Sequence, residues 1–349
     1  MSKTASRAYP NQRLQIVFGI DNAFTTTDFK RRMRFKGIAS RHLKQFDTEW
    51  RSAGEDARFF VKQRLDQAKE GVKVAPLIQV LALRLSLQAI HDVDVTTIDD
   101  DDLSFVAREI NRLWVSSKKN STLEHWSQQF KLHGALDALC PDSECSIPEK
   151  NALNLILPSY ETLWRIVLRC FMEVAFCEFT DRKVLWRMRL SKFLAEPSFT
   201  NLEDRGEWGG SIYDVVREAL RLYPPTRRVY REFQYEGRAE RELVAADIEC
   251  LQREHPKNRQ LSEKDDPVFH PQLWVRHEAE MNEGFMPFGR DKFLCPAQAK
   301  FGIWAIAILV ASLTVEVGTA WQLRPNPVTR NAPLETDREA YLNLVLRRM

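Results

Sequence analysis

The sequence predicts a mainly α-helical fold with small β-sheets. Apolar residues recur at helical spacing over several long stretches, whereas alternation of apolar and polar residues is confined to short ones. The clearest short one is 227–247, where Val, Tyr and Phe are scattered among charged residues. The main predicted helices cover 56–69, 74–90, 103–114, 151–178, 211–223 and 301–315.

In the first half of the chain, the predicted helix at 56–69 is amphipathic and the one at 74–90 is strongly apolar. The acidic run 99–102 fits a loop that leads into the N-terminus of the helix at 103–114, where negative charge favours the helix dipole. Two prolines predict a loop over 134–150.

In the second half, the long apolar helix at 151–178 contains Pro158, which should bend or interrupt it because proline cannot donate a helical hydrogen bond. Pro224 ends the helix at 211–223. The last segment, 322–348, is rich in proline and is predicted to form a terminal hairpin.

Composition narrows the class of protein. The 349 residues carry 51 Lys and Arg against 48 Asp and Glu, so a net charge of +3 gives no reason to expect nucleic acid as a partner. We expect a single domain over 1–349, because no linker-like stretch divides the chain. The N-terminus shows no apolar signal-peptide region, and the apolar run 301–315 is shorter than the ~20 residues that span a bilayer. The chain is therefore expected in the cytoplasm.

One cysteine stands where chemistry is expected. Six cysteines form no CxxC motif, but Cys295 lies in the stretch FMPFGRDKFLCPAQAKFG (285–302), immediately before an apolar helix. Positive charge at a helix N-terminus favours the thiolate, which can act as a nucleophile or as a metal ligand. The alternative is a buried structural cysteine at a helix start.

A second motif lies earlier in the chain. Glu218 and Arg221 fall three residues apart in REALRLYPP, so they can pair on one helix face. Such a pair is ordinarily a surface salt bridge of small energetic value. This one is followed by LYPP and precedes Cys295 by 77 residues. Together the motifs resemble those of the cytochrome P450 family. The run PSYETLWRIVLRC (158–170) and the loop PFG…FLCPA (287–297) resemble divergent fungal members linked to specialised metabolism.

The resemblance implies a heme b cofactor whose iron is bound by the Cys295 thiolate, in the loop that begins near Phe288. It also implies that Arg231, thirteen residues after Glu218, contacts one heme propionate. The segment FGIDNAFTTTDFKRRMRF resembles the approach to the family's C helix, whose basic residues serve the other propionate. Lys30 and Arg34, one turn apart, match best; the alternative is a solvated basic helix face.

Two further segments match the family's order. Glu161 and Thr162 stand where the family has the acid–alcohol pair that delivers protons during oxygen activation, 56 residues before Glu218 when counted from Thr162. The alternative for Thr162 is a hydroxyl bonded back to a carbonyl one turn earlier. The stretch DPVFHPQLW, 266–274, resembles the family's meander.

The sequence also departs from the family. Asp291 and Phe293 replace a glycine and an arginine of the cysteine loop, and Leu273 replaces an arginine that usually joins the Glu–Arg pair. Pro158 and Ser159 replace the small pair that opens a groove for dioxygen. The resemblance further implies that the membrane anchor, part of the N-terminal sheet and part of the F/G region are missing or contracted.

The resemblance implies a heme-thiolate monooxygenase that oxidises a small apolar organic substrate, with electrons from an NADPH-cytochrome P450 reductase. The protein would be a monomer, cytoplasmic or peripheral at the ER membrane. Two alternatives stay open. One is a P450-derived heme protein with non-redox chemistry, such as an isomerase, dehydratase or cyclase. The other is a non-catalytic P450-like binding scaffold.

Overall fold

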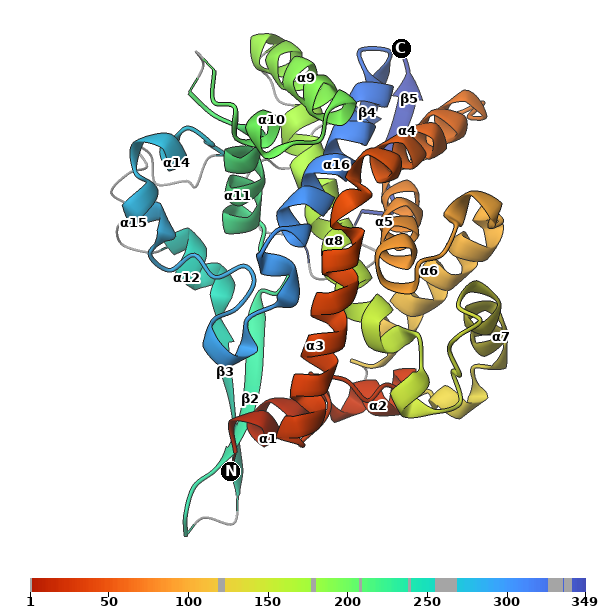
Figure 1. Ribbon diagram of the computed structural model, residues 1–349, viewed down its shortest axis with the longest axis vertical. Coiled ribbons are helices and arrows are strands. Elements are labelled where there is room, and N and C mark those ends of the chain that lie inside the picture. The colour runs from red at the N-terminus through yellow and green to blue at the C-terminus, as the bar shows by residue number, and fades with distance from the viewer. Residues whose placement is uncertain are drawn as a thin grey trace. The chain divides into compact units, whose positions relative to one another are not determined.

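A computed structural model describes residues 2–118, 123–176, 180–206, 209–237, 240–254, 269–325, 335 and 341–349. The described part is mainly helical with two small sheets, as the sequence predicts (Figure 1). It groups into two compact units, each built from three segments of the chain. Unit 1 comprises 1–45, 86–161 and 228–246, and unit 2 comprises 46–85, 162–227 and 247–349. Nothing in this grouping tests the predicted single domain, which stays a prediction.

Unit 1 collects the N-terminal helices, a helical middle segment and a β-hairpin. Its elements are α1 (Lys3–Ala8), η1 (Tyr9–Asn11), α2 (Gln12–Phe18), α3 (Phe29–Gln45), η3 (Val95–Thr97), α6 (Asp100–Ser116), η4 (Trp126–Gln128), α7 (Phe130–Leu139), η5 (Pro148–Lys150), β2 (Arg228–Gln234) and β3 (Arg241–Asp247), whose last residue falls in unit 2. The strands β2 and β3 form a two-stranded sheet, in the stretch where the sequence predicts short strands.

Unit 2 holds the apolar helices and the cysteine segment. Its elements are η2 (Phe46–Thr48), α4 (Trp50–Asp66), β1 (Val72–Lys73), α9 (Thr180–Ala195), α10 (Phe199–Glu203), α11 (Ile212–Leu222), α12 (Ile248–Glu254), α14 (Leu273–Arg276), α15 (Glu278–Asn282), η6 (Asp291–Phe293), η7 (Pro296–Gln298), α16 (Phe301–Val317), β4 (Trp321–Arg324) and β5 (Val345–Arg348). Two helices, α5 (Val74–His91) and α8 (Leu153–Ala175), belong partly to each unit.

The core of unit 2 forms around α16. This helix is apolar on every side and almost wholly buried, and it packs against α4, α9 and α11. Near Gly54 of α4 the helices pack at ordinary contact distance, since a Cβ there would lie 3.4 Å from Leu194 and 3.6 Å from Ile308. Trp50 and Trp304 pack with their ring centroids 5.5 Å apart in the same core. A helix without a polar face is stable only when buried in this way.

The predicted terminal hairpin is confirmed. Strands β4 and β5 pair antiparallel, with Leu323 opposite Leu346, and β1 pairs with the other edge of β5. The resulting sheet has the order β1-β5-β4.

One prediction about local structure is wrong. The stretch 134–150 was expected to be a loop, but α7 extends through Leu139, one residue before Cys140 and two before Pro141. Leu132, Leu136 and Leu139 are buried at helical spacing, which outweighs Gly134 within the helix. The prolines bound the helix instead of excluding it.

The described residues include one helix long and apolar enough to cross a membrane, α5, by length and composition alone. Its apolar window is 83% buried within the structure, as in the core helix of a globular protein.

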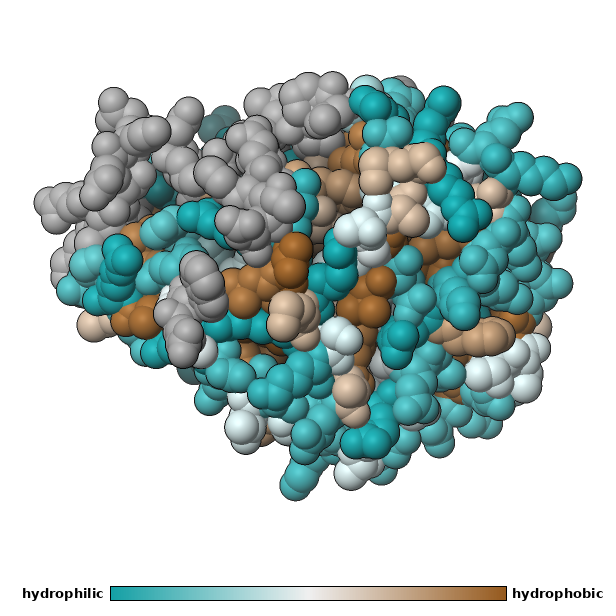
Figure 2. Space-filling model, turned by 90° about the horizontal axis from the view of Figure 1, so that it is seen from above, coloured by the Kyte–Doolittle hydropathy of each residue, from teal (hydrophilic) through white to brown (hydrophobic). Residues whose placement is uncertain are grey.

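Large exposed apolar side chains on unit 2 include Phe59 and Met188. The space-filling view shows apolar atoms interspersed with hydrophilic ones on the face seen from above (Figure 2).

Candidate functional site

The predicted Glu218–Arg221 pair is formed and is buried in unit 2. Arg221 donates from Nε to Glu218 Oε2 and from Nη2 to Oε1, both at 2.8 Å. The Glu218 side chain is fully buried and the Arg221 side chain is 5% exposed. The pair is thus not the surface salt bridge that its spacing alone allows. Charges this deep are stable only when their remaining hydrogen-bonding groups are also satisfied.

Glu218 receives two further hydrogen bonds from the meander-like segment. The Trp274 indole N–H donates to Oε2 at 3.0 Å, and the His270 backbone N–H donates to Oε1 at 3.0 Å. Leu273 offers no charged group to Glu218, but its neighbour Trp274 offers the indole N–H as a hydrogen-bond donor. Arg276, the arginine close in sequence, is exposed. The first residues of this segment, 266–268, lie outside the described residues.

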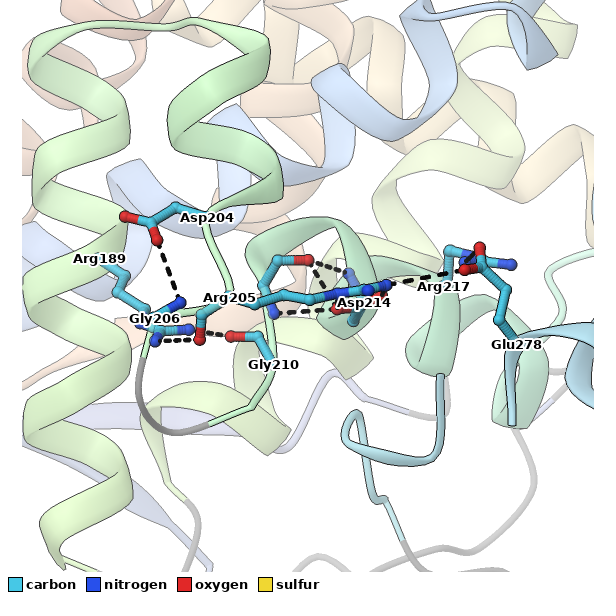
Figure 3. Close-up of polar contacts among 9 residues, drawn as sticks. Arg189, Asp204, Arg205, Gly206, Gly210, Asp214, Arg217 and Glu278 are labelled. Carbon is cyan, nitrogen blue, oxygen red and sulfur yellow. Dashed lines mark hydrogen bonds and ion pairs between the residues drawn. The ribbon is translucent and has the colours of Figure 1, made fainter. Parts of the chain in front are cut away.

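Helix α11 is anchored at its N-terminal end by a capping box. The Ser211 hydroxyl oxygen accepts from the Asp214 backbone N–H at 3.0 Å, and the Asp214 carboxylate accepts from the Ser211 backbone N–H at 3.1 Å. Arg205 donates to the same carboxylate, and Arg217 pairs with Glu278 at 3.0 Å (Figure 3). Arg217 also lies 3.8 Å from the centre of the Trp274 ring. These contacts fix the helix that carries Glu218.

The cysteine loop closes on itself through its backbone. The Cys295 N–H donates to the Phe288 carbonyl at 2.8 Å, and the Gln298 N–H donates to the Cys295 carbonyl at 3.1 Å. The Phe288 ring packs against Gly302 at the start of α16, where a Cβ would lie 2.5 Å from the ring. Only glycine allows so close an approach. The loop is therefore fastened to the apolar helix that follows it.

Asp291 takes the place of the loop glycine and adopts the left-handed backbone that glycine favours, with φ 53°. Aspartate is among the few residues that enter this region at moderate cost. An aspartate at position 291 is therefore compatible with the turn.

The cysteines differ in how well they could supply a thiolate. Burial raises the pKa of both Cys140 and Cys145 to about 12, and it also raises the pKa of Cys170. Cys250 and Cys295 are exposed. Cys250 lies on α12 near Glu254, whereas Cys295 lies in the loop. Cys177 lies outside the described residues.

In unit 1, α3 contains one buried arginine that the sequence prediction did not name. Lys30 and Arg34 are exposed, while Arg32 between them is buried, at 4% exposure. Burial lowers the pKa of Arg32. The pKa of Arg231 is lowered first by burial and second by the positive charge of Arg32. Two guanidinium groups thus lie near each other, and a bound carboxylate would stabilise both.

Arg231 itself is half-buried on β2. It donates from Nη1 to the Lys3 carbonyl at 3.2 Å and to the Ser6 hydroxyl at 3.4 Å. Sequence spacing pointed to Arg231 but not to Arg32. The other buried residue of α3 is Ala39, so no apolar pattern in the sequence marked the position of Arg32 as buried.

Within α8, Glu161 is buried and Thr162 is half-buried. Pro158 cannot donate to the Asn154 carbonyl, and the Asn22 side-chain amide donates to it instead, at 3.1 Å. The Ser159 hydroxyl donates back to the carbonyls of Leu155 and Ile156, at 2.9 and 3.0 Å. These bonds accommodate the proline within the helix.

No cluster of three or more His, Cys, Asp or Glu side chains suited to a metal ion occurs among the described residues. A single-thiolate site is not of that kind. In unit 2, the exposed loop cysteine, Cys295, is of the type that ligates heme iron as a thiolate. In unit 1, the guanidinium groups of Arg32 and Arg231 are of the type that pairs with carboxylates.

Comparison with solved structures defines the fold as that of the cytochrome P450s. CYP175A1 from Thermus thermophilus matches with a TM-score of 0.61 and 14% identity, covering 100% of this chain and 86% of that one. A 6-coordinated cytochrome P450 from another strain of Thermus thermophilus matches with a TM-score of 0.61 and 15% identity, covering 100% and 88%. The cytochrome P450DA heme domain matches with a TM-score of 0.66 and 15% identity, covering 98% and 83%.

No protein-family model matches the chain, and no curated protein matches it. The fold class predicted from the motifs is confirmed. The roles of individual site residues stay predictions.

Proposed function

We propose that the protein is a heme-thiolate monooxygenase that oxidises a small apolar organic substrate. The observation that carries this proposal is the buried Glu218–Arg221 pair, which lies in the same unit as a closed loop with an exposed cysteine, Cys295. The cytochrome P450 fold supports it. Electrons from an NADPH-cytochrome P450 reductase, a monomeric state, a place in fungal specialised metabolism and a cytoplasmic or ER-peripheral location belong to the same proposal.

When bound, heme b would supply the activation of dioxygen and the oxidising power. Cys295 would bind its iron as a thiolate. Arg231 would hold a propionate, and Arg32 would share that task with or replace Lys30 and Arg34. Phe288 would hold the loop against α16 and exclude water from the side of the thiolate. Glu218 and Arg221 would keep the loop in place without touching the substrate.

Proton delivery is the step in which the chain's own groups act. A buried carboxylate beside a hydroxyl can hold a proton and release it toward the reacting atoms. Glu161 and Thr162 are consecutive residues of α8 with that chemistry, and we propose them as the relay.

One observation favours a second candidate function. Ser159 occupies a groove position of the family pattern, and its hydroxyl is engaged with the carbonyls of its own helix. A helix closed in this way would favour non-redox heme chemistry, such as isomerisation, dehydration or cyclisation. A non-catalytic binding scaffold is the remaining alternative.

The test is a reduced carbon monoxide difference spectrum of the purified, heme-supplemented chain. The matched variants are Cys295→Ala and Cys250→Ala, which each remove one exposed cysteine. We expect a thiolate-type Soret band in the wild type and in Cys250→Ala, and its loss in Cys295→Ala. Equal loss in both variants, or no heme uptake by the wild type, would reject heme-thiolate function. If the expected spectra are obtained, turnover with a reductase would distinguish the monooxygenase from the non-redox alternative.

A further inference from the structure

Gln252 has a side-chain position that the motifs do not explain. It lies on the short helix α12, is completely buried, and uses both ends of its amide. Its Nε2 donates to the carbonyls of Leu220 and Arg221, at 2.9 and 3.3 Å. Its Oε1 accepts from the backbone N–H of Met286 at 3.0 Å. One side chain therefore joins the end of α11 to the beginning of the cysteine loop.

The chemistry of the side chain matches this place. The last carbonyls of a helix have no partner within the helix, so a buried helix end needs an outside donor. Gln252 supplies it to Leu220 and Arg221, and Arg253 Nη1 supplies it to Leu222 at 2.8 Å. The loop N–H needs an acceptor, and the amide of Gln252 offers a donor and an acceptor on separate atoms without carrying a charge.

From Met286 the hydrogen bonds continue toward the cysteine. The Met286 carbonyl accepts from the Gly289 N–H at 3.1 Å. Phe288, one of the two residues between them in this turn, accepts from the Cys295 N–H at its carbonyl, at 2.8 Å. A shift of Met286 would therefore be transmitted to the residue that carries the thiol.

A second path reaches the neighbouring residue of the loop. Glu218 accepts from the Trp274 indole, whose ring packs edge-on against Phe285 with the centroids 4.8 Å apart. The two paths start from the Glu218–Arg221 helix and end at consecutive residues, Phe285 and Met286. Gln252 thus provides the second of two connections between the helix that carries the buried ion pair and the cysteine loop.

We infer that Gln252 is a positioning residue for the Cys295 thiolate, a role that rests on the proposed function. It fixes Met286 against the end of α11, and through Met286 and Phe288 it fixes the direction of the thiol. Its loss would loosen the loop while leaving the Glu218–Arg221 pair in place.

The experiment uses the full chain with Gln252→Leu, Gln252→Glu and a control, Gln79→Leu. Gln79 is a buried glutamine of α5 that lies outside the cysteine loop and α11. Circular dichroism first shows that each variant is folded. Hydrogen–deuterium exchange of the heme-free chain then follows peptides covering 284–295, and the carbon monoxide spectrum of the heme-supplemented chain follows thiolate ligation.

We expect exchange in 284–295 to be about tenfold faster in Gln252→Leu, the loss typical of one buried hydrogen bond. Gln252→Glu keeps the acceptor for the Met286 N–H, so its exchange should stay within about threefold of the wild type. Gln252→Leu should also convert part of the thiolate-type Soret band to a non-thiolate band. Gln79→Leu should change neither.

Unchanged exchange in Gln252→Leu, or faster exchange with intact thiolate ligation, would overturn the positioning role. An equal effect of Gln79→Leu would also overturn it, because the effect would then be one of general destabilisation. Absence of a thiolate band in the wild type would reject the proposed function and this role with it, while the exchange data would still report on the contact itself.

Discussion

Helices α11 and α3 carry charges at similar spacing but use them differently. On α11, Glu218 and Arg221 turn inward, and each carboxylate oxygen of Glu218 accepts from both Arg221 and the meander-like segment. On α3, Lys30 and Arg34 face outward, whereas Arg32 is buried. A buried ion pair needs both charged partners, so a Glu and an Arg at fixed spacing can be recognised in the sequence. A basic face offers several equivalent candidates, and helical spacing alone does not choose among them.

The largest effect should come from breaking the buried pair. Glu218→Gln leaves Arg221 buried without its counter-charge, and we expect a loss of about 3–5 kcal/mol in the free energy of unfolding. The control is Glu124→Gln, which breaks an exposed pair with Arg112 on unit 1 and should cost less than about 1 kcal/mol. Urea unfolding followed by circular dichroism measures both. Similar losses in the two variants would contradict the contrast between buried and exposed pairs.

The next effect tests the tryptophan that donates to the pair. Trp274→Phe keeps an aromatic ring but removes the donor to Glu218, so it should cost about 1–3 kcal/mol beyond the lost ring area. Trp50→Phe serves as its control, because the Trp50 indole donates at 3.1 Å to Asp47, whose side chain is 42% exposed. Thermal unfolding compares the variants. A larger loss in Trp50→Phe would show that the indole bond to Glu218 adds nothing.

A smaller effect should distinguish the basic residues of α3. If heme is bound as proposed, Arg32→Gln should weaken heme retention about tenfold, which corresponds to about 1.4 kcal/mol. Lys30→Gln and Arg34→Gln should each change it less than about twofold, since exposed charges are screened. Heme transfer to an acceptor protein gives the rates. A stronger effect at Lys30 or Arg34 would favour the assignment predicted from sequence over Arg32.

The smallest effect concerns pH and lies within unit 1. Burial lowers the pKa of His91 and of His42 in the folded state. The unfolded chain therefore binds protons first on acidification, so stability should fall as pH drops below about 6.5, the ordinary histidine value. His91→Gln should flatten the dependence of the melting temperature on pH between about 7.5 and about 5.5, whereas His125→Gln, at an exposed residue, should not. Parallel pH profiles for all three proteins would contradict this origin.

The fold could be predicted from the sequence where one local pattern, such as a continuous apolar run or a pair of prolines, is stronger than the conflicting signals around it. Helix α16 was predictable because its apolar residues leave no polar face, and α11 because two prolines follow it. Helix α7 was not, because Gly134 and the later prolines outweighed three buried leucines in the prediction. Residues that act through contacts distant in sequence left no local pattern. Gln252 is the clearest case, since its partners lie more than thirty residues away on either side.

The site was predictable to a similar extent. The Glu218–Arg221 pair follows from motif and spacing and is formed, whereas the role of Cys295 stays a prediction. The departure at Leu273 could not be interpreted, because the compensating donor is an indole, Trp274, and not another cation. Arg32 differs from its basic neighbours in its burial and not in its residue type, so the sequence did not single it out.

Asp291 has a consequence for how such proteins are found. It makes a left-handed turn with a side chain in place, at a position where the family pattern has glycine. A search that demands glycine there passes over any chain that reaches the same torsion angles with aspartate or asparagine. For remote members of a fold, the sign of a backbone angle is thus a more durable signature than the residue letter. We expect Gly and Asn to be the only substitutions at 291 that preserve the turn without cost.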